Sequence, residues 1–180
     1  MAGRALRQER VPGRHDGTVA RRARRAGALS RLAVNGAPAV VVDASVALKW
    51  LVAEPDSPAA DALAQSWARA GLSIVAPYLF GAEISNVLHQ LVRRKLLSAD
   101  GALALLIRLT AFRIVYVQPP GINTRALLLA DALGLPAAYD AHYLALAESM
   151  GCELWTADAK FQRQARERFP RIRLLAEHAA

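Results

Sequence analysis

The stretch Val40-Val41-Val42-Asp43-Ala44-Ser45 decides how the rest of this sequence is interpreted. Three consecutive β-branched residues are typical of a strand that is covered on both faces, as in parallel sheets flanked by helices. The run ends on an acidic residue, and an unpaired acid is costly to bury. The stretch therefore predicts a central parallel strand that delivers Asp43 to its carboxyl end, where α/β sheets place their ligand sites.

Strand-like and helix-like segments alternate over the remainder of the chain. Further strands are expected at 73–76, 114–117, 153–156 and 172–175. Helices are expected at 46–52, 59–70, 78–97, 99–112, 123–133, 139–150 and 158–168. Such alternation predicts an α/β fold with a mainly parallel sheet of about five strands. No Gly-x-Gly-x-x-Gly motif follows the first strand, which argues against a dinucleotide-binding domain.

The positive charge of the chain is concentrated before the first strand. The formal net charge is +8, and residues 1–37 hold nine arginines against Glu9 and Asp16. All but one of the net positive charges therefore belong to this segment, which we expect to be a disordered leader. It could be a nucleic-acid-binding arm, a transit-type sequence or translation from an upstream start. We favour the third, and we assign 38–180 to a single nuclease-like domain.

Other bulk features narrow the class of protein. No apolar run approaches the roughly 18 residues that span a bilayer. The single cysteine, Cys152, can build neither a disulfide framework nor a zinc site. No signal-peptide core follows the basic start. Together these observations lead us to expect a cytoplasmic protein.

Four acidic residues fall where a parallel sheet would gather them. Asp43 and Asp158 follow predicted strands, Asp140 opens a predicted helix, and Glu83 lies in the first turns of another. Clustered carboxylates repel, and their pKa values rise unless a cation neutralises them. Mg²⁺ and Mn²⁺ prefer oxygen ligands, and one or two such ions can activate water against a phosphodiester. The four positions therefore predict a metal-dependent hydrolase.

Three of the four acids also have a purely structural interpretation. Asp140 and Asp158 are well placed to cap the helices that follow them. Glu83 in a first helical turn interacts favourably with the helix dipole. Asp43 is the exception, because an acid directly after three valines points to a functional site on its own. The prediction rests on all four together.

Three polar residues accompany the acids as candidate supporting residues. Ser45 is placed to orient a metal-bound water, or else to cap the helix after it. Asn86 lies three residues after Glu83, so both project from one helical face. Thr156 ends a predicted strand, where ordinary β-propensity also explains it.

The larger aromatic residues are interpreted as parts of the core or of a dimer interface. Stacking on RNA bases is the alternative interpretation. These residues are Trp50, Trp67, Trp155, Tyr139 and Tyr143.

The ordered set of acids resembles the PIN-domain family, and within it the VapC toxins of bacterial toxin–antitoxin pairs. The matching stretches are VVDASVALKWLV (41–52), APYLFGAEISNVLHQLVRRKLLS (76–98) and LADALGLPAAYDAHYLALAESMGCELWTAD (129–158). The resemblance covers about residues 40–175 and leaves the Arg-rich leader outside, since such toxins usually begin close to the first strand.

The resemblance implies a three-layer α/β/α fold and a Mg²⁺- or Mn²⁺-dependent endoribonuclease that leaves 5′-phosphate and 3′-hydroxyl ends. It implies a homodimer that binds a VapB-type antitoxin, and operator DNA only through that complex. The positions that match the family's metal-binding acids are Asp43, Glu83, Asp140 and Asp158, and those that match its supporting positions are Ser45, Asn86 and Thr156.

Two competing classes remain to be weighed. A haloacid-dehalogenase-type phosphatase also has an Asp after its first strand, but that chemistry needs Asp-x-Asp and position 45 is serine. A non-catalytic PIN-like module, acting through an antitoxin partner and operator DNA, is the alternative to a nuclease. The sequence leaves open which RNA is cut and whether one or two metal ions bind.

Overall fold

The computed structural model describes residues 37–178, so the predicted leader lies outside the described residues except for Ala37. At the centre is a five-stranded sheet with the order β3-β2-β1-β4-β5, in which every neighbouring pair is parallel. The strands are β1 (Ala39–Val42), β2 (Ser73–Ala76), β3 (Val115–Tyr116), β4 (Leu154–Thr156) and β5 (Ile172–Leu174). The predicted parallel sheet is confirmed.

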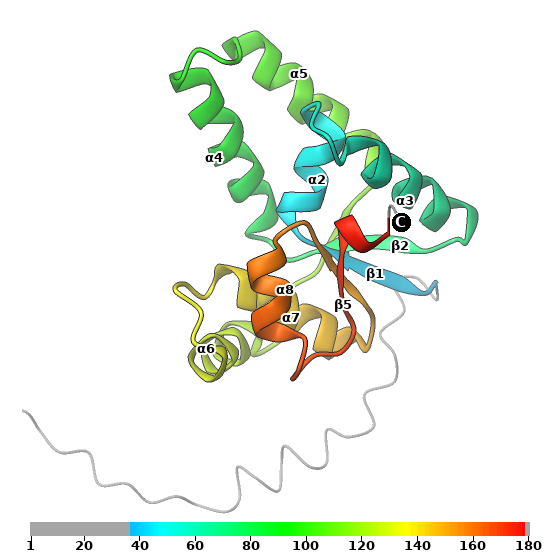
Figure 1. The fold of residues 1–180 in the computed structure, drawn as a ribbon, viewed down its shortest axis with the longest axis vertical. Helices are drawn as coiled ribbons and strands as arrows, with labels where there is room; N and C mark the ends of the chain where they lie inside the picture. The colour runs from blue at the N-terminus through cyan, green and yellow to red at the C-terminus, as the bar shows by residue number, and fades with distance from the viewer. Residues whose placement is uncertain (1–36, 179–180) are drawn as a thin grey trace, which may run out of the picture. The chain divides into compact units, whose positions relative to one another are not determined.

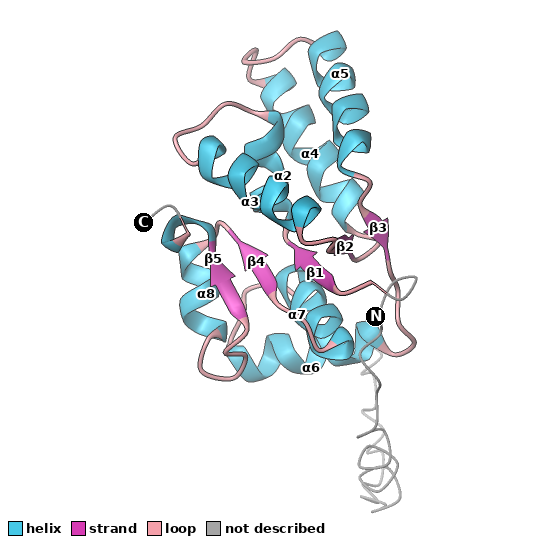
Figure 2. Cartoon of the chain, turned by 90° about the vertical axis from the view of Figure 1, so that its right-hand side faces the viewer, coloured by secondary structure: helices cyan, strands magenta, loops and turns pink. Residues whose placement is uncertain are grey.

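Helices cover both faces of this sheet (Figures 1 and 2). On one face lie α2 (Ala44–Leu51), α3 (Ser57–Arg69), α4 (Phe80–Arg93) and α5 (Ala99–Leu109). On the other lie α6 (Ile122–Leu133), α7 (Tyr139–Met150) and α8 (Ala159–Ala165). The described part of the chain is therefore a three-layer α/β/α fold, as expected. None of its helices is long and apolar enough to cross a bilayer.

The core forms where the valine run meets the first helices. Val40, Val41 and Val42 are almost completely buried, because β1 is the middle strand and both of its faces are covered. Trp50 of α2 stacks on Phe112 with ring centroids 4.4 Å apart. The core interpretation is confirmed for Trp50, as for Trp67, Trp155 and Tyr143. Tyr139 is 63% exposed, so it is not a core residue, and its assignment to a dimer interface stays a prediction.

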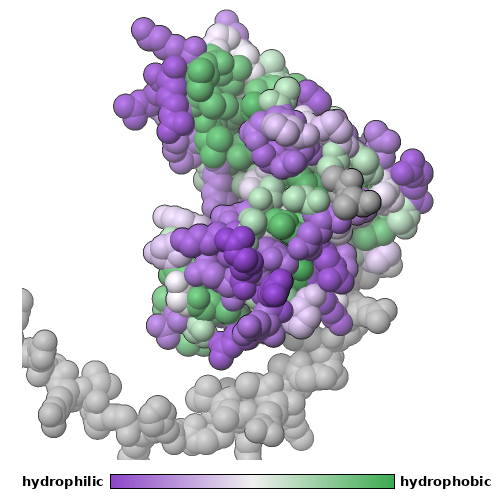
Figure 3. All heavy atoms as spheres, viewed as in Figure 1, coloured by the Kyte–Doolittle hydropathy of each residue, from purple (hydrophilic) through white to green (hydrophobic). Residues whose placement is uncertain are grey.

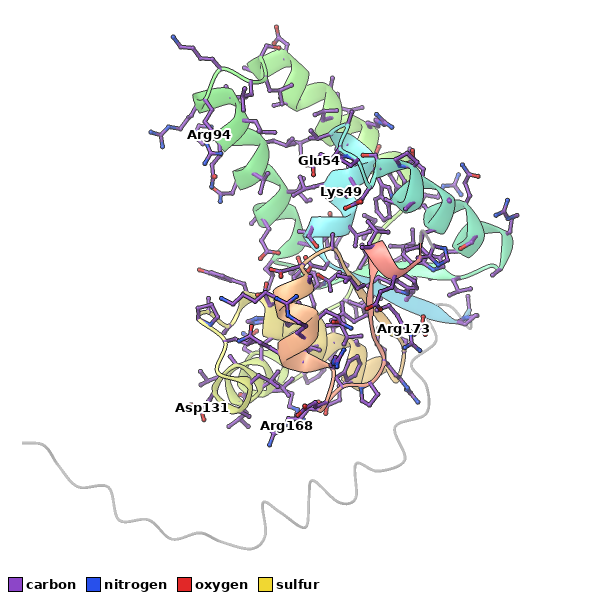
Figure 4. All side chains as sticks on the ribbon, viewed as in Figure 1. Lys49, Glu54, Arg94, Asp131, Arg168 and Arg173 are labelled. Atoms are coloured by element: carbon purple, nitrogen blue, oxygen red, sulfur yellow. The ribbon has the colours of Figure 1, made fainter. Side chains whose placement is uncertain are left out.

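Several helix ends differ from the predicted ones. The helix expected at 78–97 ends at Arg93, and Lys95 takes a left-handed conformation with φ 59°. The helix expected to reach 168 ends at Ala165. α4 and α5 run side by side as a hairpin that extends beyond the sheet (Figures 1 and 2), and Figure 4 shows Arg94 at its outer end.

The connections after three strands are short. α2 begins two residues after β1 ends, α4 begins four residues after β2 ends, and α8 begins three residues after β4 ends. Because the strands are parallel, these helices all start at the same edge of the sheet. This edge is where the four predicted acids lie, and it positions the candidate site.

Candidate active site

Asp43 is fixed by hydrogen bonds to both of its carboxylate oxygens. It is the N-cap of α2, and its Oδ1 accepts the backbone N–H of Ser45 at 3.0 Å. Its Oδ2 accepts the hydroxyl of Thr156 at 2.6 Å. Only 6% of Asp43 is exposed. The alternative in which Ser45 caps this helix is therefore wrong, because Asp43 caps it and the helix starts at Ala44.

Ser45 and Thr156 join the ends of β1 and β4. The Ser45 hydroxyl accepts the N–H of Ala157 at 2.9 Å and lies 3.3 Å from the Thr156 hydroxyl. Since Thr156 gives its one hydroxyl hydrogen to Asp43, Ser45 donates to Thr156. The Thr156 oxygen also accepts the N–H of Asp158 at 3.0 Å. These two predicted supporting residues therefore bond to Asp43 and to each other, and they hold the Asp43 side chain in place.

Asp158 both caps a helix and presents a free oxygen. Its Oδ1 accepts the N–H groups of Lys160 at 2.7 Å and Phe161 at 3.0 Å, which makes it the N-cap of α8. Its Oδ2 has no hydrogen bond within residues 37–178. The capping interpretation is correct, and it leaves one oxygen of this exposed side chain available to a ligand.

Glu83 lies in the first turn of α4, as the sequence predicts. Its carboxylate accepts the hydroxyl of Tyr143, which reaches it from α7 on the other side of the sheet edge. Tyr143 is fully buried. The sequence predicts a core, interface or base-stacking role for Tyr143 and does not predict this hydrogen bond. The available signal was its spacing, since Tyr143 lies three residues after Asp140 and so shares a helical face with it.

Asp140 is the second residue of α7 and is half-buried. The N-cap position of this helix is Ala138, and no side chain caps it. The capping interpretation of Asp140 is therefore wrong. Its carboxylate is instead close enough to Asp43 and Asp158 for their charges to affect it.

The electrostatics show that the carboxylates lie together without a counter-charge. Burial raises the pKa of Asp43. Burial, followed by the charges of Asp43 and Asp140, raises the pKa of Glu83 to about 7, although Tyr143 opposes this. Burial and the charges of Asp43 and Asp158 raise the pKa of Asp140 to about 6. Within residues 37–178 none of the four acids takes part in an ion pair.

This donor set fits a divalent cation in its chemistry. Asp43, Glu83 and Asp140 have raised pKa values, and none of the four acids has an ion-pair partner in residues 37–178, so a cation that binds oxygen would stabilise the group. In the conformation described, no three His, Cys, Asp or Glu side chains of residues 37–178 have the spacing of a formed metal cluster. The residues therefore fit Mg²⁺ or Mn²⁺ in kind, and the side chains must close around an ion to bind it.

Asn86 lies one helical turn beyond Glu83 on α4, as predicted, but it makes no hydrogen bond to a residue in the described part of the chain. Both residues line a hollow of about 460 Å³ that also contacts Asp43 and Tyr139. Of the three supporting residues, Asn86 is the one that lines this hollow.

Another hollow, of about 360 Å³, lies between α6, α7 and the segment before β5. Arg125 and Glu148 form a bidentate ion pair on its wall, with Arg125 Nη2 2.6 Å from a carboxylate oxygen. The acid there is neutralised, in contrast to the four carboxylates. This hollow therefore offers no comparable chemistry.

Comparison with known proteins bears on the fold and the family of this chain. A family model described as PIN domain matches residues 40–167. The crystal structure of PAE2754 from Pyrobaculum aerophilum is similar to this chain with a TM-score of 0.57 and 23% sequence identity, covering 83% of this chain and 98% of that one. At this identity the similarity shows the fold alone. No curated protein sequence matches the chain.

Proposed function

Because this chain belongs to the PIN-domain family, whose members are generally nucleases, we propose that it is a Mg²⁺- or Mn²⁺-dependent endoribonuclease. The observation that carries the proposal is the group of four carboxylates that have no ion-pair partner in residues 37–178. The proposed metal ligands are Asp43, Glu83, Asp140 and Asp158.

The chain's own residues prepare this site before any ligand arrives. Ser45 and Thr156 hold Asp43 in one orientation, and Tyr143 holds Glu83. Fixed ligands favour binding because less conformational entropy is lost when the site closes. A bound divalent ion would supply an activated water and would neutralise charge on the scissile phosphate.

The carboxylates must lose their protons when the site binds a metal ion. At neutral pH a carboxyl group with a pKa of about 7, such as Glu83, carries its proton about half of the time. Cation binding needs the ionised form and releases that proton. Metal affinity should therefore rise with pH through neutrality, and cleavage activity should rise with it.

We further propose that the protein acts as the toxin of a VapBC-type toxin–antitoxin pair. The support is the ordered resemblance of residues 41–52, 76–98 and 129–158 to VapC toxins. On this proposal the chain forms a homodimer, binds a VapB-type antitoxin and reaches operator DNA only through that complex. In growing bacteria, induction of the intact chain should then arrest growth, and induction of an Asp43→Asn variant should not.

The direct test is cleavage of RNA by the purified chain in Mg²⁺ or Mn²⁺, with EDTA as one control. Asp43→Asn removes the charge but keeps an oxygen that can cap α2. Asp131→Asn is the matched control, because Asp131 is an exposed acid on α6, far from the start of α2 in Figure 4. We expect cleavage by the wild type and by Asp131→Asn only.

Two outcomes would contradict the proposal. Cleavage that survives both EDTA and Asp43→Asn would show that the reaction does not use this site. Failure of the folded wild type to cut any of tRNA, rRNA or mRNA would instead favour the alternative of a non-catalytic PIN-like module that acts through an antitoxin partner and operator DNA.

A further inference from the structure

The hollow beside the carboxylates has one acidic wall and one wall of apolar or uncharged residues. Asp43 and Glu83 form the acidic side. The remaining lining residues are apolar or uncharged, and they come from the start of α2, from α4 and from the start of α7: Ala44, Leu79, Ala82, Asn86, Val87 and Tyr139. Figure 3 shows the surface notched between the α4–α5 hairpin and the helices below it, the side on which α4 faces the start of α7.

Two polar side chains of this hollow have no partner in the described structure. Tyr139 is 63% exposed, and it makes neither a hydrogen bond nor an aromatic contact within residues 37–178. The Asn86 amide, one turn beyond Glu83, is exposed and is likewise without a hydrogen bond to a described residue. Tyr143 of the same helix, by contrast, is buried and bonded. Neither packing nor helix capping accounts for Tyr139.

No Lys or Arg lines this hollow, so away from a cation at the two acids it offers a phosphate no positively charged partner. A flat, uncharged group needs no such partner. It can lie against the apolar wall, with an aromatic ring for stacking and an amide for hydrogen bonds. Unpaired nucleobases are recognised in this way, by stacking on aromatic side chains and by hydrogen bonds to their edges.

We propose that this hollow is the subsite for one unpaired base of the RNA substrate, next to the phosphate held at the carboxylates. Tyr139 stacks on the base, and the Asn86 amide binds its edge. Asp43 and Glu83 belong to both the hollow and the proposed metal site, so the base and the cut phosphate are neighbours along one strand. The substrate is therefore single-stranded at the cut, since a paired base in a helix cannot enter. This inference rests on the proposed function.

The first experiment measures base binding without cleavage. Adenosine, guanosine, cytidine and uridine have no phosphate, need no metal and cannot be cut. Saturation-transfer NMR on the full chain should show transfer to base protons of at least one of them. Tyr139→Ala and Asn86→Ala should abolish that signal, whereas Tyr139→Phe should keep it because the ring still stacks.

Tyr78→Ala is the matched control, because Tyr78 is 65% exposed but does not line the hollow. It should bind nucleosides as the wild type does. Absence of binding to the wild type, or binding that survives Tyr139→Ala, would overturn the proposal. So would a dimer that dissociates on Tyr139→Ala and excludes nucleosides, since a second copy of the chain would then occupy this face.

The second experiment uses RNA with one abasic nucleotide on either side of the mapped cut. In the wild type, one of the two abasic substrates should lower kcat/KM about tenfold or more, the effect of losing one stacked base. In Tyr139→Ala the difference between this substrate and the intact RNA should be much smaller, because only the Asn86 contact remains to be lost. If RNA is cut but abasic substitution has no effect, the subsite is wrong and the nuclease stands. If nucleosides bind but no RNA is cut, the hollow binds bases and the proposed nuclease function is wrong.

Discussion

Replacement of Tyr143 by phenylalanine should weaken metal binding in a way that depends on pH. The change removes only the hydroxyl that donates to Glu83 and leaves the buried ring in place. That hydrogen bond favours the ionised carboxylate and holds the pKa of Glu83 below the value that burial would otherwise give. Without it, Glu83 keeps its proton to higher pH, and the proton competes with the metal.

The size of the effect follows from the strength of the lost bond. A hydrogen bond to a charged group contributes about 1.5–3 kcal/mol. We reduce this to about 1.4 kcal/mol because Glu83 is only half-buried and solvent screens it, which corresponds to one pKa unit. With a wild-type pKa of about 7, the ionised fraction at pH 7 falls from about a half to about a tenth. Metal affinity should fall roughly fivefold at pH 7 and roughly tenfold at pH 6, and by almost nothing at pH 9.

Calorimetric titration with Mn²⁺ at pH 6, 7 and 9 measures this directly, and a thermal melt confirms that the variant is folded. Tyr78→Phe is the control, because its side chain is exposed and lies outside the hollow. Equal affinities of Tyr143→Phe and the wild type at pH 6 and 7 would refute the reasoning. A loss of equal size at all three pH values would also refute it, since that would indicate a displaced ligand and not a changed proton affinity.

Four further predictions follow from the same site. Without metal at pH 8, Asp43→Asn should change the melting temperature by no more than a few degrees, because the removal of a buried charge whose pKa is raised offsets the loss of the Thr156 hydrogen bond and the helix cap is kept; a larger change in either direction would contradict this. Glu83 and Asp140 have raised pKa values of about 7 and about 6, so the stability that they contribute is present below about pH 4 and is lost as pH rises through these values; metal-free urea denaturation should show the fall, and millimolar Mn²⁺ should remove it. Thr156→Val should cost about 1–3 kcal/mol in the same assay, because Asp43 loses a buried hydrogen-bond donor; a cost near zero would mean that the bond is not important. Deletion of residues 1–37 should leave metal-dependent cleavage intact, and a truncated, folded but inactive protein would show that the leader takes part.

The strands and the helix starts at the sheet edge were predictable because their signals are local. The valine run of β1 shows a strand covered on both faces, and the residues that end the next strands are followed closely by helices. The ends of α6 and α7 were also predictable from the sequence, since Gly134 and Gly151 take left-handed conformations directly after them.

Other boundaries depend on tertiary contacts and carry no such signal. α4 stops before Lys95, a residue type that seldom adopts a left-handed conformation. No glycine or proline lies between Arg93 and Gly101, so the predicted helix extended to 97. The chain turns there because α5 packs back against α4 as a hairpin, a contact that helical periodicity within one segment does not show.

The candidate site was predictable in its acids but not in the groups that hold them. Asp43 and Asp158 stand out because they follow strands. Tyr143 does not stand out, because it lies on the apolar face of a buried helix and pattern alone assigns it to the core. Its hydroxyl meets Glu83 only when α7 and α4 come together at the sheet edge.

Asp43 and Asp158 each start a helix as well as serving as proposed metal ligands. The two roles need different things from the side chain: the cap needs one acceptor oxygen, and the ligand needs a negative charge. Asparagine meets the first need and fails the second, and a single nucleotide change converts an aspartate codon into an asparagine codon. An intact but inactive scaffold is therefore one mutational step away at either position. If the protein restrains growth as proposed, selection for escape from it should yield folded but inactive copies with asparagine at these positions.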